Sequence, residues 1–532
     1  MKSTELKYWR PGISTKALAR LAAPALLAVL SMSASCGGDG EVVAQECEGT
    51  VCPCNEAGIR DAISKGGDRY TFACNGPTTV TTEAEIVIEN DVVLDGEDNL
   101  IVEGGMTHRV FRVPLDVTVE LRRLTIKRGG GVQQGGGVAN SGLLTIREST
   151  ISDSVVDGDG AGIGAGGIHN RILGDLTLIN STVSGNGTVE GVGGGIGNDV
   201  GAKLTVIDST VSGNATPDQG GARIANLGSA MISGGSVSGN AANYNAGGLL
   251  NEPMAVLTVV DSAVSGNTAL NGRGGGIANF GGTVSIATTM VSENAAENYH
   301  GGGIYNDPSG TMRLTESTVS KNSSQSQSGG IANEGTLTIE NSTISENSAL
   351  YNAGGIGIGE QATVILLNST VSGNSAGNWA GGVGGDWVPR LTLIASTVAD
   401  NVASGGGSAI ALRHAEALTI RNSLIVGDCY GGFYCGSTCA GNIESTGDTC
   451  GFDPVTNQVN VTAEQLNLGP LQDNGGPTLT QLPGPGSTAL DEIDEESCVD
   501  VDENPLKRDQ RGVARPQGPS CDVGAAEVAP EL

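Results

Sequence analysis

The chain has 532 residues, of which 85 are glycine and 3% are aromatic, and its formal net charge is −30. Such a composition excludes a core built from Phe, Tyr and Trp, and the glycines lack the three-residue period of collagen. An acidic surface repels phosphate backbones, so we expect no nucleic-acid partner. The acidity is typical of a protein that stays in solution outside a cell.

The N-terminus has the pattern of an export signal. Five basic residues within the first 20 positions precede the apolar run from Leu21 to Leu30, and small residues follow up to Cys36. The run is shorter than the roughly 20 apolar residues that span a bilayer, which favours a signal peptide over residues 1–35.

The residues Ser33-Ala34-Ser35-Cys36 resemble the lipobox of bacterial lipoproteins, with Ser33 where leucine is usual. The resemblance implies cleavage before Cys36, acylation of that cysteine and a short linker over residues 36–46. Ordinary signal cleavage near the same place is the alternative. We therefore expect an exported protein, either an outer-membrane lipoprotein or a protein of the cell surface or extracellular space.

Ten further cysteines form three separate groups outside the central repeats. An even number confined to the ends of an exported chain predicts disulfides that staple terminal caps. A zinc site at Cys52 and Cys54 is the alternative, but their spacing is shorter than usual and no histidine lies nearby. The candidates are Cys47, Cys52, Cys54, Cys74, Cys429, Cys435, Cys439, Cys450, Cys498 and Cys521.

An imperfect repeat of about 27 residues fills the middle of the chain. Its main element is LTLINSTVSGN at 176–186, LTIENSTISEN at 337–347 and similar copies between 144 and 428. A second element, GGGIxN, precedes many copies, as at 193–198 and 301–306. Apolar residues alternate with small polar ones, which predicts three short strands per period, with Gly and Asn at the corners.

This pattern predicts an all-β fold, a single right-handed parallel β-helix of about eleven coils with disulfide-stapled caps. We expect the N-terminal cap and first coils over residues 47–128 and the repeats over 129–428. A cysteine-rich insertion would occupy residues 429–465 and a C-terminal domain residues 466–532. Residues 56–63 have helical spacing and could cover the open first coil.

The closing asparagine of the main element recurs at one corner of nine successive coils. Stacked amides can bond to the coils above and below, so we expect a structural ladder along the β-helix. The predicted members are Asn186, Asn214, Asn240, Asn267, Asn294, Asn322, Asn347, Asn374 and Asn401.

The GGGIxN and STVSGN elements resemble right-handed β-helix proteins of the polymorphic outer-membrane-protein and pectin-lyase-like superfamily. The tail resembles the choice-of-anchor Q domain, through LGPLQDNGGPTLTQLPGPGSTALDEI at 468–493 and DQRGVARPQGPSCDVGAAE at 509–527. Together these resemblances cover most of the chain after the signal. They imply the fold and a surface location but leave the activity open, because one fold serves many functions.

Catalysis is one function that the superfamily resemblance raises, since many of its members cleave acidic polysaccharides. Hydrolases of that kind carry NTD, DD, GHG and RIK elements, and this sequence contains none of them. The histidines are scattered, and only His169 beside Arg171 suggests acid–base chemistry, with an exposed corner pair as the other interpretation. We expect no catalytic residues and keep a polysaccharide lyase or hydrolase as the alternative.

Metal binding has a candidate in Asp157 and Asp159, which could contribute to a Ca²⁺ site. They match neither the EF-hand loop nor the glycine-rich calcium nonapeptide, so a solvated acidic loop is the other interpretation. We expect no cofactor.

Binding is the function that the scarce aromatic residues favour. Tyr244, Tyr299, Tyr351 and Trp379 each follow the corner asparagine of their coil by four or five positions, which predicts one aromatic edge. Such an edge could stack on successive sugars of a glycan, although the rings could instead pack together or shield the Gly-Gly corner. A passive structural rod is the third interpretation. The expected partner of this adhesin-like monomer is a polysaccharide or surface protein, with membrane contact only through the lipid anchor.

Overall fold

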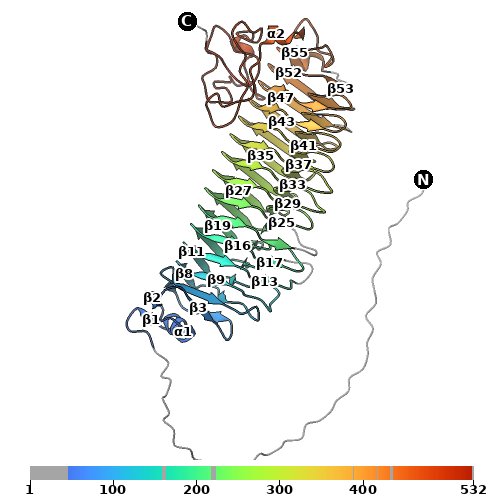
Figure 1. Cartoon of the computed structure of the whole chain (residues 1–532). Helices are drawn as coiled ribbons and strands as arrows, with labels where there is room; N and C mark the ends of the chain where they lie inside the picture. Colours follow the sequence, from blue (N-terminus) through green and yellow to red (C-terminus); the bar gives the residue numbers. More distant parts are fainter. Residues whose placement is uncertain are drawn as a thin grey trace, which may run out of the picture. The chain divides into compact units, whose positions relative to one another are not determined.

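The computed structural model describes residues 46–158, 163–216, 223–386, 389–415, 417–431 and 435–529. The predicted signal peptide, Cys36 and Asp159 lie outside these ranges. Within them the chain forms a right-handed parallel β-helix of about 13 turns, slightly more than the expected number (Figure 1). All of its named strand pairs are parallel, as stacked coils require.

Over the described residues, to which the following strand numbers refer, four parallel sheets make up the walls of the β-helix. Sheet A has 16 strands, from β1 (Val51–Pro53) to β54 (Cys439–Ala440). Sheet B has 16, from β3 (Thr78–Thr81) to β56 (Gln458–Val461). Sheet C has 14, from β4 (Ile86–Val87) to β53 (Cys429–Gly431). Sheet D has 10 described strands of two residues each, from β13 (Val155–Val156) to β49 (Val402–Ala403).

One coil shows how the repeat folds. Its strands are β14 (Ile168–Asn170) in sheet C, β15 (Asp175–Ile179) in sheet A, β16 (Thr182–Ser184) in sheet B and β17 (Gly187–Thr188) in sheet D. The first three are the strands that the repeat predicts. The fourth strand follows the corner asparagine and was not predicted. A strand of two residues is too short to show the alternation of apolar and polar residues.

The core is a stack of aliphatic side chains. In β15, Leu176 and Leu178 point inward and are fully buried, whereas Asp175, Thr177 and Ile179 remain partly exposed. The pairing of β15 with β19 (Lys203–Ile207) places Leu176 beside Leu204, so like residues stack from coil to coil. Burial of such columns supplies the main stabilisation, at about 25 cal/mol per Å² of apolar surface.

The nine predicted ladder asparagines lie in one column at the corner between sheets B and D. Each amide nitrogen from Asn186 to Asn374 donates to the side-chain oxygen of the next member, over 2.8–3.2 Å. The backbone N–H of each donor residue bonds to the same oxygen, for example from Asn294 to Asn322 at 2.9 Å. All nine side chains are buried, so the column satisfies polar groups that water cannot reach.

A second asparagine column lies at the corner between sheets C and A. Its amides donate from coil to coil over 2.7–2.9 Å. Serine and threonine hydroxyls form a third column between sheets A and B, as where Ser342 N–H donates to Ser369 Oγ at 3.2 Å. The second column consists of Asn140, Asn170, Asn198, Asn226, Asn251, Asn279, Asn306 and Asn333.

Both ends of the stack are covered. Helix α1 (Glu56–Lys65) caps the first coil, where Ile59, Ala62 and Ile63 join the core, and Asn55 caps the helix by accepting from Gly58 N–H at 2.8 Å. Five disulfides pair cysteines within or near these caps. The pairs are Cys47–Cys52, Cys54–Cys74, Cys429–Cys450, Cys435–Cys439 and Cys498–Cys521.

The stack continues beyond Asp428 through β53, β54, β55 (Ile443–Ser445) and β56, so the cysteine-rich segment extends the walls of the β-helix. The following residues include helix α2 (Ala463–Leu466) and pack against the outer side of sheet B. There Gln510 Nε2 donates to Thr343 Oγ1 at 2.8 Å. In the described part of the chain, neither α-helix is long and apolar enough to cross a membrane.

Candidate functional site

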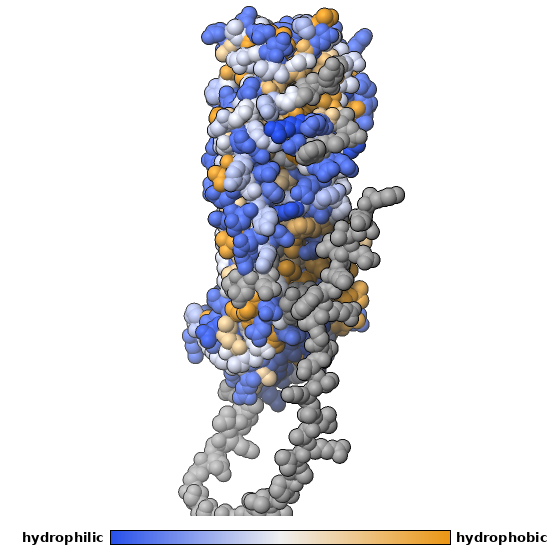
Figure 2. Space-filling view, turned by 90° about the vertical axis from the view of Figure 1, so that its right-hand side faces the viewer, coloured by the Kyte–Doolittle hydropathy of each residue, from blue (hydrophilic) through white to orange (hydrophobic). Residues whose placement is uncertain are grey.

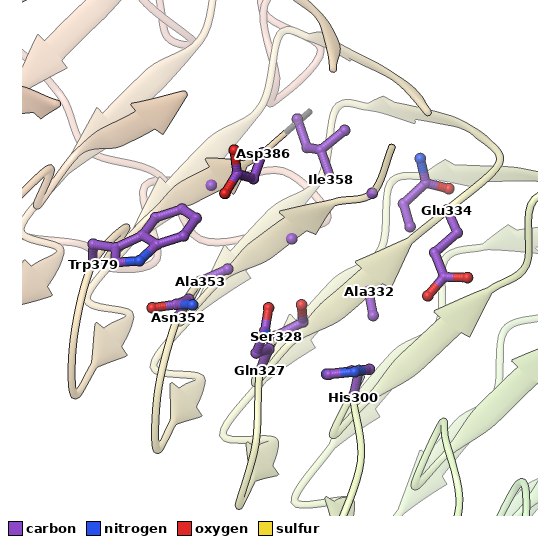
Figure 3. Close-up of a pocket in the computed structure, with 15 residues that line it drawn as sticks. His300, Gln327, Ser328, Ala332, Glu334, Asn352, Ala353, Ile358, Trp379 and Asp386 are labelled. Atoms are coloured by element: carbon purple, nitrogen blue, oxygen red, sulfur yellow. The ribbon is translucent and has the colours of Figure 1, made fainter. Parts of the chain in front are cut away.

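One hollow in the described structure lies on the outer side of sheet C and combines an aromatic ring with polar and charged side chains. In β34 (Ile304–Asn306) the outward middle residue is Tyr305. The next three strands, β38 (Ile331–Asn333), β42 (Ile356–Ile358) and β46 (Val383–Gly385), carry only Ala332, Gly357 and Gly384 at that position. The small residues leave an open groove of about 330 Å³ across three coils (Figure 3), a volume within the usual range of ligand sites.

Two walls flank this floor. One consists of the loops between sheets D and C, which contribute His300, Gln327, Asn352 and Trp379 (Figure 3). The corner between sheets C and A forms the other and contributes Glu334 and Asp386. The lining therefore combines a large aromatic ring with amides, an imidazole and two carboxylates, all of which can recognise a polar ligand.

The end of the groove nearer the N-terminus is closed by a packed polar cluster. Tyr305 is only 1% exposed, and its ring lies 5.4 Å from the Phe280 ring and 4.8 Å from the Arg273 guanidinium. Its hydroxyl donates to Glu334 Oε2 at 2.9 Å and accepts from Arg273. Burial, together with the bond to Glu334, raises the pKa of Tyr305, so the phenol remains protonated and holds the Glu334 carboxyl in place.

The other end is closed by stacked cationic and aromatic side chains. The Arg413 guanidinium lies 5.1 Å from the Trp379 ring and 5.6 Å from the Tyr430 ring, both within cation–π distance. Arg413 also lies 3.8 Å from Asp386. These contacts restrict the Trp379 ring before any ligand arrives, which lowers the entropic cost of binding.

His300 completes the wall near Tyr305. Burial and the positive charge of Arg273 lower the pKa of His300, so the ring is neutral at pH 7. Its Nδ1 atom is buried and has no hydrogen-bond partner within the described residues. A neutral imidazole can both donate and accept, which suits contact with hydroxyl groups.

In the structure, Trp379 is separated from the three tyrosines of the predicted aromatic edge. Trp379 lines the groove, whereas Tyr244, Tyr299 and Tyr351 lie on the neighbouring loops outside its lining and are 46–54% exposed. On the face of the β-helix shown in Figure 2, polar residues predominate over most of the described surface. Amide ladders join the loops themselves, as where Asn298 Nδ2 donates to Asn271 Oδ1 at 2.8 Å.

Two other candidates lie outside the lining of the groove. The suggested pairing of His169 with Arg171 at an exposed corner is wrong, because His169 is buried and its Nε2 lies 3.1 Å from Asp199. Asp157 belongs to no metal-ligand cluster, since the described residues contain no group of three or more His, Cys, Asp or Glu side chains that could hold an ion.

The groove residues Glu334 and Asp386 were not singled out from the sequence, although a signal was present. The GGGIxN element changes to AGGIGI at 353–358 and AGGVGG at 380–385. Its closing asparagine is replaced there by Ile358 and Gly385, and its variable residue becomes glycine. The second asparagine column accordingly ends at Asn333, where the groove opens.

Comparison with known proteins supports the β-helix fold. No curated protein and no solved structure matches the chain. A model of the family described as "Right handed beta helix region" matches residues 287–449, a segment that contains the candidate groove. The stacked coils and this match together identify the chain as a parallel β-helix protein.

Proposed function

We propose that this protein is an exported, lipid-anchored surface protein whose groove on sheet C binds a glycan, for adhesion or glycan capture. One observation carries the proposal: three successive small residues, Ala332, Gly357 and Gly384, open a trough whose wall contains an indole ring. Aromatic rings contribute large apolar faces with defined geometry, and amide and carboxylate groups can bond to hydroxyls. Sugar rings offer both of these surfaces.

The surface location is supported by the sequence of the N-terminus. The basic and apolar segment before Cys36 has the order of a signal peptide, and the lipobox-like residues supply an attachment point. Five disulfides fit an oxidising compartment outside the cytoplasm. We assign the tail from residue 466 to a choice-of-anchor Q-like domain on the basis of its sequence.

Affinity electrophoresis through gels loaded with different polysaccharides tests the proposal. We expect the purified protein to be retarded in at least one gel without clearing it, because the groove would hold the glycan but leave it intact. Retardation with clearing would replace binding by cleavage as the function. Free migration through every gel would contradict glycan binding and favour a passive structural rod.

A further inference from the structure

The charged groups of the groove restrict the chemistry of the ligand. Glu334 and Asp386 both line it, and Glu360 lies beside Glu334 in an adjoining hollow of the same corner. All three are acidic and come from successive coils at the corner between sheets C and A. A ligand that lies along the groove therefore passes a row of carboxylates.

The neighbouring cations are already engaged with protein groups. Arg273 bonds to Tyr305 and lies 3.5 Å from Glu334. Arg413 lies 3.8 Å from Asp386 and covers the Trp379 ring. Arg390, at the start of β47 (Arg390–Ile394), donates to the Gln361 carbonyl oxygen at 3.4 Å. A carboxylated ligand would therefore compete with Glu334 and Asp386 for these guanidinium groups.

The dimensions of the floor limit how much of the ligand is held. Ala332, Gly357 and Gly384 occupy consecutive coils, and coils are separated by about 4.8 Å, so the open floor is about 14 Å long. The coil spacing is close to the advance per unit of an extended β-linked sugar chain. Tyr305 bounds the floor at one end. At the other end the next outward residue, Ala411, is also small, but it is fully buried in a cluster against which Trp379 packs, so the floor ends there.

We infer that the groove selects a linear glycan without carboxylate groups, about three sugar units of which lie along the stack of coils with one ring against Trp379. The inference rests on the proposed glycan-binding function. It excludes polyuronates, because their carboxylates would lie opposite Glu334 and Asp386 and the whole chain already carries a net charge of −30. Glu334 and Asp386 then serve as acceptors for pairs of sugar hydroxyls.

The test compares polymers that share a backbone and differ in charge. A glucan is paired with the same glucan oxidised at C6 to polyglucuronate, and a mannan with polymannuronate, and retention of the whole protein is measured in gels containing each. We expect a neutral member to be retained at least about tenfold more tightly than its uronate counterpart. For the retained backbone, calorimetric titration with oligosaccharides should show affinity that rises up to about three units and then levels off.

Charge variants distinguish a failure of the inferred ligand class from a failure of glycan binding itself. Glu334→Gln with Asp386→Asn should raise retention by the uronate, whereas Glu293→Gln with Glu316→Gln, at exposed corners away from the groove, should not. Equal retention of uronate and neutral polymer, lost in Ala332→Tyr, would overturn the ligand class but keep glycan binding. No effect of the groove charge variants, or affinity that continues to rise beyond three units, would also overturn the inference. Failure to retain any of the polymers would overturn glycan binding itself.

Discussion

Replacing Asn294 by alanine is expected to lower the free energy of unfolding by about 3 kcal/mol or more. The Asn294 side chain donates to Val264 O and to Asn322 Oδ1, each at 2.9 Å. It also accepts from the backbone N–H and the amide of Asn267, each at 3.0 Å. Its loss removes the bonds to Val264 O, to the Asn267 backbone N–H and to one hydrogen of the Asn267 amide, whereas Asn322 Oδ1 still accepts from the backbone N–H of residue 294. Each buried group left unpaired costs about 1–3 kcal/mol.

The matched control is Asn298→Ala. Asn298 donates to Leu270 O and to Asn271 Oδ1, each at 2.8 Å, but its side chain is exposed, so water can replace both bonds. We expect a change within about 0.5 kcal/mol. Urea unfolding gives the comparison, and hydrogen exchange of the Asn267 amide reports on the ladder if the coils do not unfold together. Equal midpoints for the two variants would contradict a stabilising ladder.

Replacing Trp379 by alanine is expected to weaken glycan binding by about tenfold or more, because burial of a large side chain against a ligand contributes about 1.5–3 kcal/mol. Trp379 lies in the wall of the groove, and Arg413 holds its ring in place. Calorimetric titration with the retained glycan measures the effect. An unchanged unfolding midpoint would show that the loss is local.

Tyr351→Ala distinguishes the groove from the aromatic edge that the sequence suggests. Tyr351 is 54% exposed and lies outside the groove lining, so its removal should change the affinity by no more than about twofold. A platform built from the whole edge would instead lose affinity in both variants. Full affinity in Trp379→Ala would contradict the assignment of the indole to the binding site.

The sequence predicts the repeating architecture because its signals are local and recur. Each coil repeats an inward Ile, Val or Leu, a glycine corner and an asparagine. An imperfect copy of the repeat is therefore still recognised by comparison with its neighbours. The Leu176–Leu204 stacking and the amide column through Asn294 both follow from this period. The second asparagine column, which ends at Asn333, could have been predicted from the same period, since GGGIxN also closes with asparagine.

The groove could not be predicted in the same way, because it depends on the lack of large side chains at three positions. Gly357 and Gly384 fit a corner-forming repeat, and only their place on the outward face of sheet C, in the same row as Tyr305, makes them a floor. The packing of the C-terminal tail against sheet B could not be predicted either. Gln510 contacts Thr343 and Thr370 although they are more than a hundred residues away, and no periodicity indicates that the tail folds back on sheet B.

The most direct test of glycan binding in the groove is the retention of Ala332→Tyr beside the wild type in the same polysaccharide gel. Tyrosine is compatible with this position, since Tyr305 occupies the equivalent place in the preceding strand and is buried there. Its ring should fill the floor without unfolding the coil. We expect the variant to keep the wild-type unfolding midpoint and to migrate freely where the wild type is retarded. Equal retardation of the two proteins would show that any glycan binds elsewhere and would contradict the proposed site.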